Sequence, residues 1–273
     1  VKTTAFDPNK FTVPEARPLP IFLLLDVSTT MGAVIDTTHV RFTGETFFQD
    51  GKEWEVVEGG TSKMDLMNEA IKSMLNNFAE SEKQELSILV TVITFGDDAR
   101  LHLSPTVASA INWHDLEPNG ETALGAALKM AKTMIEDKKI IPSRAYRPTI
   151  VLVSDGQPND DWEAAMKNFI STGRSSKCDR MAMAIGTDAN KEVLGKFLEG
   201  TPHSLFSDDD ASTIHKFFQM VTMSVTSRSR SLNPNLIPST SIFTEAGSAG
   251  QSQSSRDTSE LEDEGYCKLF APY

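Results

Sequence analysis

Up to about residue 225, two kinds of hydrophobic pattern follow each other in turn along the chain. Short runs of apolar and β-branched residues, such as those at 20–25 and 86–95, are typical of strands that are buried on both faces. Longer segments with apolar residues every three or four positions, such as those at 64–78 and 124–135, predict amphipathic helices. Because strands and helices alternate, we expect a three-layer, doubly wound α/β fold with a mostly parallel central sheet.

The remaining elements follow from the same two patterns. Thr61 or Ser62 is placed to cap the start of the first helix with its hydroxyl group. An alternating run at 100–103 predicts an antiparallel edge strand beside the strand at 86–95. We also expect strands at 148–154, 181–185 and 204–206, and helices at 107–113, 162–170, 191–198 and 214–225.

A segment rich in β-forming residues, 33–62, separates the first strand from the first helix. Runs at 40–42 and 46–49 precede Asp50-Gly51, and a further alternating run at 53–57 follows it. An Asp-Gly dipeptide between two such runs favours the tight turn of a hairpin. The segment therefore predicts a β-hairpin inserted into the α/β fold.

The two ends of the chain differ from its middle. Residues 1–16 contain prolines and little periodicity, so we expect an extended arm. Residues 227–273 become polar and then acidic, and such a segment cannot bury enough apolar area to offset its ordering entropy. Apolar and aromatic residues return at 266–273, which we interpret either as a docking motif or as a sticky end without a role. The predicted domain is therefore 17–226, followed by a largely disordered tail.

Composition narrows the classes of partner. The chain has 273 residues, of which 39% are hydrophobic, enough for a sizeable core. An excess of acidic residues, 38 against 26 basic ones, argues against binding to nucleic acid or to anionic membranes. Cys178 and Cys267 lie far apart in unlike surroundings, which fits a reducing compartment rather than a disulfide framework. No apolar run approaches the roughly 20 residues of a membrane span. We therefore expect a cytoplasmic protein, whose oligomeric state the sequence leaves open.

Oxygen-bearing side chains follow several of the predicted strands. Asp26, Ser28 and Thr30 come directly after the first strand, at every second position. Thr122 lies in the loop before a central helix, and Asp155 follows a later buried strand. In a doubly wound sheet such loops meet at the carboxyl ends of the strands. Carboxylates and hydroxyls without His or Cys favour Mg²⁺ or Mn²⁺ over zinc, with Ca²⁺ less favoured.

This ordered set resembles the von Willebrand factor A domains, also found in integrins, and their metal-ion-dependent adhesion site (MIDAS). The resemblance covers roughly residues 17–226 and rests on Asp26-x-Ser28-x-Thr30, on Thr122 and on Asp155. It implies a Rossmann-like sheet and a divalent ion held by the hydroxyl oxygens, with the two aspartates contributing directly or through water. It also implies an open coordination position for a carboxylate of a partner protein, and binding rather than catalysis. Among the branches of the family, the segment 17–26 looks most like bacterial TerY-like proteins.

Two features depart from the family pattern. Thr30 replaces a serine, which keeps the oxygen and adds a methyl group. The insertion at 33–62 stands where the family has a short link, beside the expected metal. It is a surface hairpin without a role, or it shapes partner choice, or one of its glutamates fills the open metal position in the free protein. The candidate residues for these contacts are Glu45, Glu53, Trp54, Glu55 and Glu58, together with Gly120 and Glu121 in the loop of Thr122.

Three hypotheses of function follow. The first is a cytoplasmic, TerY-like module that uses its metal to bind an acidic residue of a protein partner in a bacterial stress-response, phosphorylation-linked or defence assembly. The second is an extracellular adhesion domain. The third, a metal-dependent enzyme of phosphoester chemistry, is disfavoured because the chain has no glycine-rich phosphate loop and no paired general acid and base, so we assign no catalytic residue.

Overall fold

The computed structural model describes residues 16–49, 52–82, 86–186, 189–208, 211–237 and 268–270. Predictions for residues 1–15, for the Asp50-Gly51 turn and for most of the tail lie outside this part of the chain. Within the described residues, no helix is long and apolar enough to cross a membrane.

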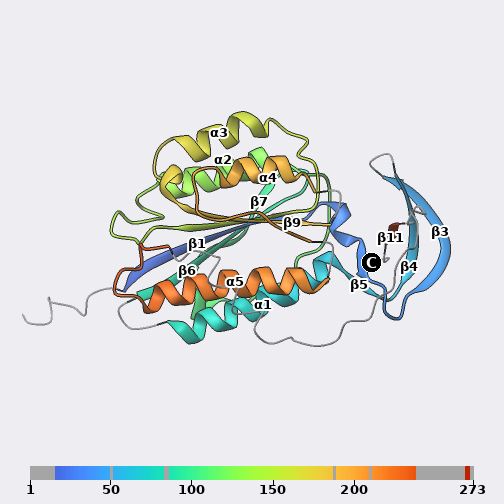
Figure 1. The fold of residues 1–273 in the computed structure, drawn as a ribbon, viewed down its shortest axis with the longest axis horizontal. Helices are drawn as coiled ribbons and strands as arrows, with labels where there is room; N and C mark the ends of the chain where they lie inside the picture. The colour runs from blue at the N-terminus through green and yellow to red at the C-terminus, as the bar shows by residue number, and fades with distance from the viewer. Residues whose placement is uncertain are drawn as a thin grey trace, which may run out of the picture.

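A six-stranded sheet lies at the centre of the domain, in the order β10-β9-β8-β1-β6-β7 (Figure 1). Its strands pair in parallel, except that β7 runs antiparallel to β6 at one edge. This arrangement confirms the prediction of a mostly parallel sheet with one antiparallel edge strand. The strands are β1 (Arg17–Asp26), β6 (Leu86–Phe95), β7 (Ala99–Val107), β8 (Thr149–Ser154), β9 (Asp179–Ile185) and β10 (Phe206–Asp208).

Helices cover both faces of this sheet and complete three layers (Figure 1). One face carries α1 (Lys63–Ser81) and α5 (Ala211–Arg230), which also pack against each other. The opposite face carries α2 (Leu124–Glu136), α3 (Trp162–Ser171) and α4 (Lys191–Leu198). The predicted three-layer, doubly wound α/β fold is confirmed.

β1 is the strand where both halves of the core meet. Leu23 and Leu25 pack in the hydrophobic cluster of α1 and α5, whereas Phe22 and Leu24 pack in that of α2, α3 and α4. All four side chains are fully buried, and each such burial contributes about 1.5–3 kcal/mol. Packing on both faces therefore fixes the position of Asp26, the last residue of β1.

The insertion forms a second sheet next to the carboxyl ends of the central strands (Figure 1). β3 (Arg41–Gln49) and β4 (Lys52–Glu58) pair antiparallel, which confirms the predicted hairpin. At its base, β2 (Val34–Asp36) pairs antiparallel with β5 (Thr61–Ser62). A strand near the end of the chain, β11 (Lys268–Phe270), pairs parallel with β4. The aromatic end of the chain therefore contains a paired strand.

The helix predicted at 107–113 is wrong. Only one 3₁₀ turn, Ala108–Ala110, forms there. The reason lies in the neighbouring structure, because β7 continues to Val107 and the backbone N–H of Ser109 donates to the Glu82 carboxylate at 3.1 Å. Backbone groups satisfied in this way have no need of a helix.

Two boundaries near the end of the domain also differ from the predictions. The last strand, expected at 204–206, is observed at Phe206–Asp208. The last helix continues past the predicted domain boundary at residue 226 and ends at Arg230. The extra turn contains Arg228, whose side chain is buried. A buried arginine gives this turn a structural role that its polar sequence conceals.

Candidate metal centre

β1 and β8 bring the predicted ligands to the same edge of the sheet. The two strands are parallel neighbours. From β1 the chain continues to β6 on one side, and from β8 it continues to β9 on the other. Loops that diverge from adjacent strands leave a crevice outside their carboxyl ends, where α/β proteins bind ligands. Asp26 ends β1 and Asp155 follows β8, so both carboxylates lie at this crevice.

The Asp26 carboxylate is fully buried and tightly held. Its Oδ1 accepts a hydrogen bond from the backbone N–H of Ser28 at 2.8 Å, and its Oδ2 accepts one from the Ser154 hydroxyl at 2.6 Å. Burial and the nearby charge of Asp155 nevertheless raise the pKa of Asp26 to about 7, against the opposing effect of these hydrogen bonds. A cation bound beside Asp26 would oppose both effects and favour the charged carboxylate.

Ser28 and Thr30 place their hydroxyls between the two aspartates. Their oxygen atoms lie 3.0 Å apart. Both hydroxyls also contact Oδ1 of Asp155, Thr30 at 2.9 Å and Ser28 at 3.4 Å. Ser28 and Thr30 lie more than a hundred positions before Asp155 in sequence. They reach it because a 3₁₀ turn, Thr29–Gly32, folds back shortly after β1. The methyl group of Thr30 is accommodated without loss of these contacts.

The loop of Thr122 is tied to the loop that follows β1. The backbone N–H of Asn119 donates to the carbonyl of Val27 at 2.5 Å, and the N–H of Thr29 donates to the carbonyl of Gly120 at 2.9 Å. A Cβ atom at Gly96 would lie only 2.2 Å from the carbonyl oxygen of Asn119, so the approach requires glycine. These contacts bring Thr122 to the crevice.

Gly156 leaves open the space into which the ligands point. A Cβ atom at this position would lie 3.0 Å from the Thr122 hydroxyl and 3.9 Å from Oδ2 of Asp26. The structure thus brings together all five residues that the sequence predicted to be metal ligands: Asp26, Ser28, Thr30, Thr122 and Asp155. Two carboxylates and three hydroxyls around a small space suit a hard divalent cation.

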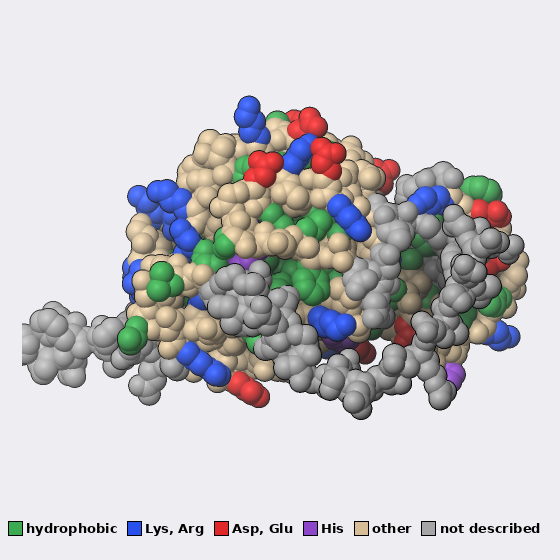
Figure 2. Space-filling model, viewed as in Figure 1, with side chains coloured by type: hydrophobic (Ala, Val, Ile, Leu, Met, Phe, Trp, Pro, Cys, Tyr) green, Lys and Arg blue, Asp and Glu red, His purple; other side chains and the backbone are tan. Residues whose placement is uncertain are grey.

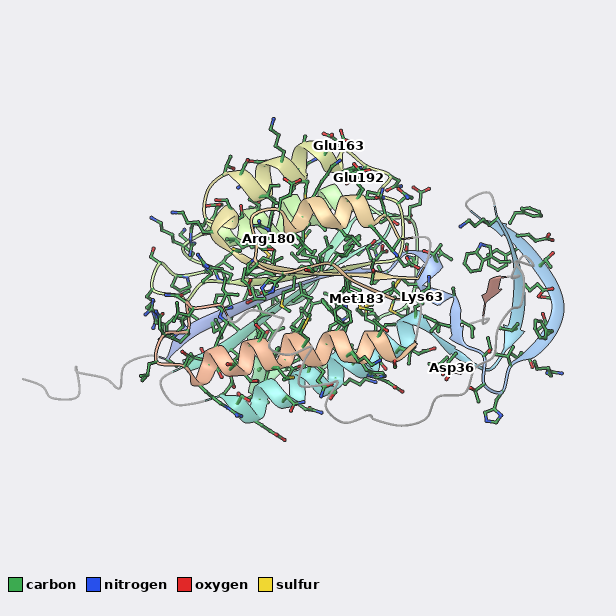
Figure 3. The ribbon with its side chains drawn as sticks, in the orientation of Figure 1. Asp36, Lys63, Glu163, Arg180, Met183 and Glu192 are labelled. Atoms are coloured by element: carbon green, nitrogen blue, oxygen red, sulfur yellow. The ribbon has the colours of Figure 1, made fainter. Side chains whose placement is uncertain are left out.

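Lys63 also belongs to this cluster, and the sequence reasoning missed it. Its Nζ donates to Oδ2 of Asp155 at 2.7 Å, and its side chain is only 11% exposed. Lys63 is the first residue of α1, where Ser62 and Asp65 form a capping box, and Figure 3 labels it at the helix end that faces the insertion. A lysine at the positive end of a helix is locally unfavourable. The unfavourable position of Lys63 in the sequence could therefore have indicated that a carboxylate elsewhere in the fold stabilises this lysine.

The candidate glutamates of the insertion lie apart from this cluster. Among the described residues, no hydrogen bond or ion pair joins them to the five predicted ligands. Glu45, Glu53 and Glu58 are exposed, and Glu58 pairs with Arg41. Glu55 is half-buried.

Three further candidates occupy two different places. Trp54 is buried in the hairpin, where its ring stacks on Phe47 with centroids 6.4 Å apart. Gly120 and Glu121 lie on the loop of Thr122. The backbone N–H of Glu121 donates to Asp97 at 3.0 Å, and its carboxylate accepts a hydrogen bond from Asn159. These last two residues therefore flank the crevice.

The five predicted ligands include no histidine and no cysteine. Within the described ranges, no three His, Cys, Asp or Glu side chains form a group able to hold a metal. This agrees with a donor set of two carboxylates completed by hydroxyls. Cys178 is a free, buried thiol, and burial raises its pKa to about 12.

Comparison with known proteins assigns the chain to a family. The model of the von Willebrand factor type A domain matches residues 21–157, half of the chain. The chain belongs to this family. The matched part of this von Willebrand factor type A domain includes all five predicted ligands and Lys63. No functionally curated protein matches the chain.

Solved structures share the fold of the domain at low sequence identity. Proximal thread matrix protein 1 from the mussel byssus superposes with a TM-score of 0.52 and 17% identity, over 77% of this chain and 47% of its own. A structure of that protein with a zinc-occupied MIDAS motif superposes with a TM-score of 0.51 and 17% identity, over 77% of this chain and 46% of its own. A von Willebrand factor type A protein from Catenulispora acidiphila has a TM-score of 0.48 and 17% identity, over 77% of this chain and 43% of its own. The match thus spans less than half of each of these proteins, and the likeness is one of fold.

Proposed function

We propose that this von Willebrand factor type A domain is a protein-binding module that holds a divalent metal ion at a MIDAS and uses it to capture an acidic residue of a partner. The observation that carries the proposal is the convergence of two carboxylates and three hydroxyls from three separate loops on the space beside Gly156. The family supports it, because these domains are interaction and adhesion modules.

The chemistry of the ligands accounts for the proposed specificity. Ser28, Thr30 and Thr122 are neutral, so a bound Mg²⁺ or Mn²⁺ keeps positive charge that attracts an incoming Asp or Glu. When bound, the ion supplies an electrophilic centre for that carboxylate. Lys63 offsets part of the charge of Asp155 and leaves the loaded site more positive than the five ligands alone would make it. Gly120 and Glu121 lie beside the crevice, where they would contact the partner.

The proposed biological setting is a cytoplasmic, TerY-like role in a bacterial stress-response, phosphorylation-linked or defence assembly. The segment Arg17–Asp26 and the acidic balance of the chain support it. We propose that the module binds and does not catalyse. The insertion and the tail would then add contacts to the partner outside the metal centre.

Affinity retention tests this proposal. The full chain is immobilised and exposed to a lysate of its own organism in Mg²⁺ or in EDTA, with Asp26→Ala as the defective variant and Lys72→Met as the surface control. We expect the same proteins to be retained by the wild type and by Lys72→Met in Mg²⁺ only, and by Asp26→Ala in neither buffer. If the same proteins were retained in EDTA and by Asp26→Ala, the proposal would be contradicted.

A further inference from the structure

β4 has a partner on each of its edges. On one side it pairs antiparallel with β3, to which the hairpin joins it. On the other side it pairs parallel with β11, in the register Lys268 to Trp54, Leu269 to Glu55 and Phe270 to Val56. The C-terminal segment thus acts as an added strand on the insertion, on the side of β4 nearer the domain (Figure 1).

This added strand is short and its connection is long. β11 has 3 residues, so its ladder supplies few hydrogen bonds, each with a small net contribution to stability. Against this stands the entropy of closing the chain between the end of α5 at Arg230 and the start of β11 at Lys268. The pairing is therefore weak enough to exchange, and once released the β4 edge would present unpaired backbone groups.

The insertion has the chemistry of a surface that binds peptides. Its hairpin buries Trp54 and Val57, yet Phe42 is 61% and Phe48 is 76% exposed, and hydrophobic side chains are visible on its surface (Figure 2). β4 also carries three glutamates, Glu53, Glu55 and Glu58, against one lysine, Lys52, so this strand is acidic. A basic residue followed by apolar ones therefore complements this edge.

The added strand also lies near the proposed metal centre. β11 packs against β2 as well as β4, and β2 begins at Val34, directly after the 3₁₀ turn that contains Thr30. A segment that replaced β11 would thus lie beside the loop that carries Ser28 and Thr30.

We propose that the β4 edge binds an extended peptide by parallel strand addition. The chain's own C-terminal segment occupies this edge in cis, and a partner's segment with the same basic-then-apolar pattern replaces it. The surface is separate from the metal ligands and needs no ion.

A double proline variant of the full chain releases β11 from β4, and it can be compared with the wild type, in which β11 is paired. Leu269→Pro/Phe270→Pro removes two consecutive backbone N–H groups from β11 and so prevents the ladder whichever residue donates. The control is Ser254→Pro/Ser255→Pro, which places the same two prolines elsewhere in the tail. The probe is a fluorescent synthetic peptide with the sequence of residues 265–273, and a scrambled peptide serves as its control.

We expect the probe to bind Leu269→Pro/Phe270→Pro at least tenfold more tightly than the wild type or the proline control, equally in Mg²⁺ and in EDTA. Hydrogen exchange of the β4 amides should be faster in that variant and slow again when the probe is added. Equal binding to all three chains, or no binding to the variant, would overturn the proposal. A wild-type dimer that the variant loses would also overturn it, since β11 would then come from a second copy.

Discussion

The central sheet carries a buried polar cluster at each end, and the two clusters differ in how their charges are matched. At the amino ends of β8 and β9, Asp179 lies against Arg228 and receives a 2.8 Å contact from His203. The guanidinium of Arg228 donates to the carbonyls of Pro234 and Arg147 and to the Thr149 hydroxyl. Every charge there has a partner inside the fold.

The carboxyl end lacks that balance. Asp155 contacts the ammonium group of Lys63, whereas the hydrogen bonds of Asp26 come from hydroxyl and backbone groups. Burial and the charge of Asp155 raise the pKa of Asp26. A cluster closed by its own arginine holds the fold together, whereas one with two carboxylates and a single ammonium group is suited to bind a cation. The comparison thus separates a cluster suited to stabilising the fold from one suited to binding a cation.

The largest expected effect is on the closed cluster. Arg228→Met removes one partner of a buried ion pair and leaves Asp179 uncompensated, so we expect the free energy of unfolding to fall by about 3–5 kcal/mol. Urea denaturation of the full chain in EDTA measures it. A loss well below this range would mean that the amino-end cluster is not the structural one.

The matched change at the open cluster should act on binding instead. Asp26→Asn removes a charge that burial disfavours, so we expect the free energy of unfolding in EDTA to change by less than about 1 kcal/mol. Affinity for Mn²⁺ should fall by at least about 100-fold, or roughly 2.7 kcal/mol. Isothermal titration calorimetry and urea denaturation measure the two quantities. Global unfolding of this variant would erase the contrast between the ends of the sheet.

A smaller effect is expected at Lys63. Its ammonium competes with a metal ion for Asp155, so Lys63→Met should tighten Mn²⁺ binding by about tenfold, or roughly 1.4 kcal/mol. Calorimetry again provides the measurement. Weaker Mn²⁺ binding in the variant would show that Lys63 supports the ion rather than competing with it.

The smallest effect is expected at the exposed pair of Lys72 with Asp115, the control for Lys63. Exposed ion pairs contribute about 0–1 kcal/mol. Lys72→Met should therefore leave Mn²⁺ affinity unchanged and stability within about 1 kcal/mol of the wild type. Calorimetry and denaturation on the same preparations check both values.

Local patterns predicted most of the fold and the residues that gather at the site. The apolar run at 86–95 matches β6 from end to end, because a strand buried on both faces leaves a continuous record in sequence. The five oxygen-bearing residues were found for a similar reason, since each follows a strand or precedes a helix. Their role as metal ligands stays a prediction.

Residues whose role depends on distant partners escaped prediction. Lys63 meets a carboxylate 92 positions away, and Arg228 meets Thr149 79 positions away. Both look like surface cations when only their neighbours in sequence are considered. The pairing of β11 with β4 is equally non-local, so no local pattern could choose between a docking motif and a sticky end.

Mn²⁺ titration of the full chain tests the central claim most directly, with free Mn²⁺ followed by electron paramagnetic resonance. The comparison is between the wild type and Thr122→Val, which removes one hydroxyl and keeps the shape of the side chain. We predict one Mn²⁺ per wild-type chain and an affinity at least about tenfold weaker in the variant, with the fold of both verified by circular dichroism. Equal affinity in the two chains, or no Mn²⁺ bound by the wild type, would contradict a metal centre at the carboxyl end of the sheet.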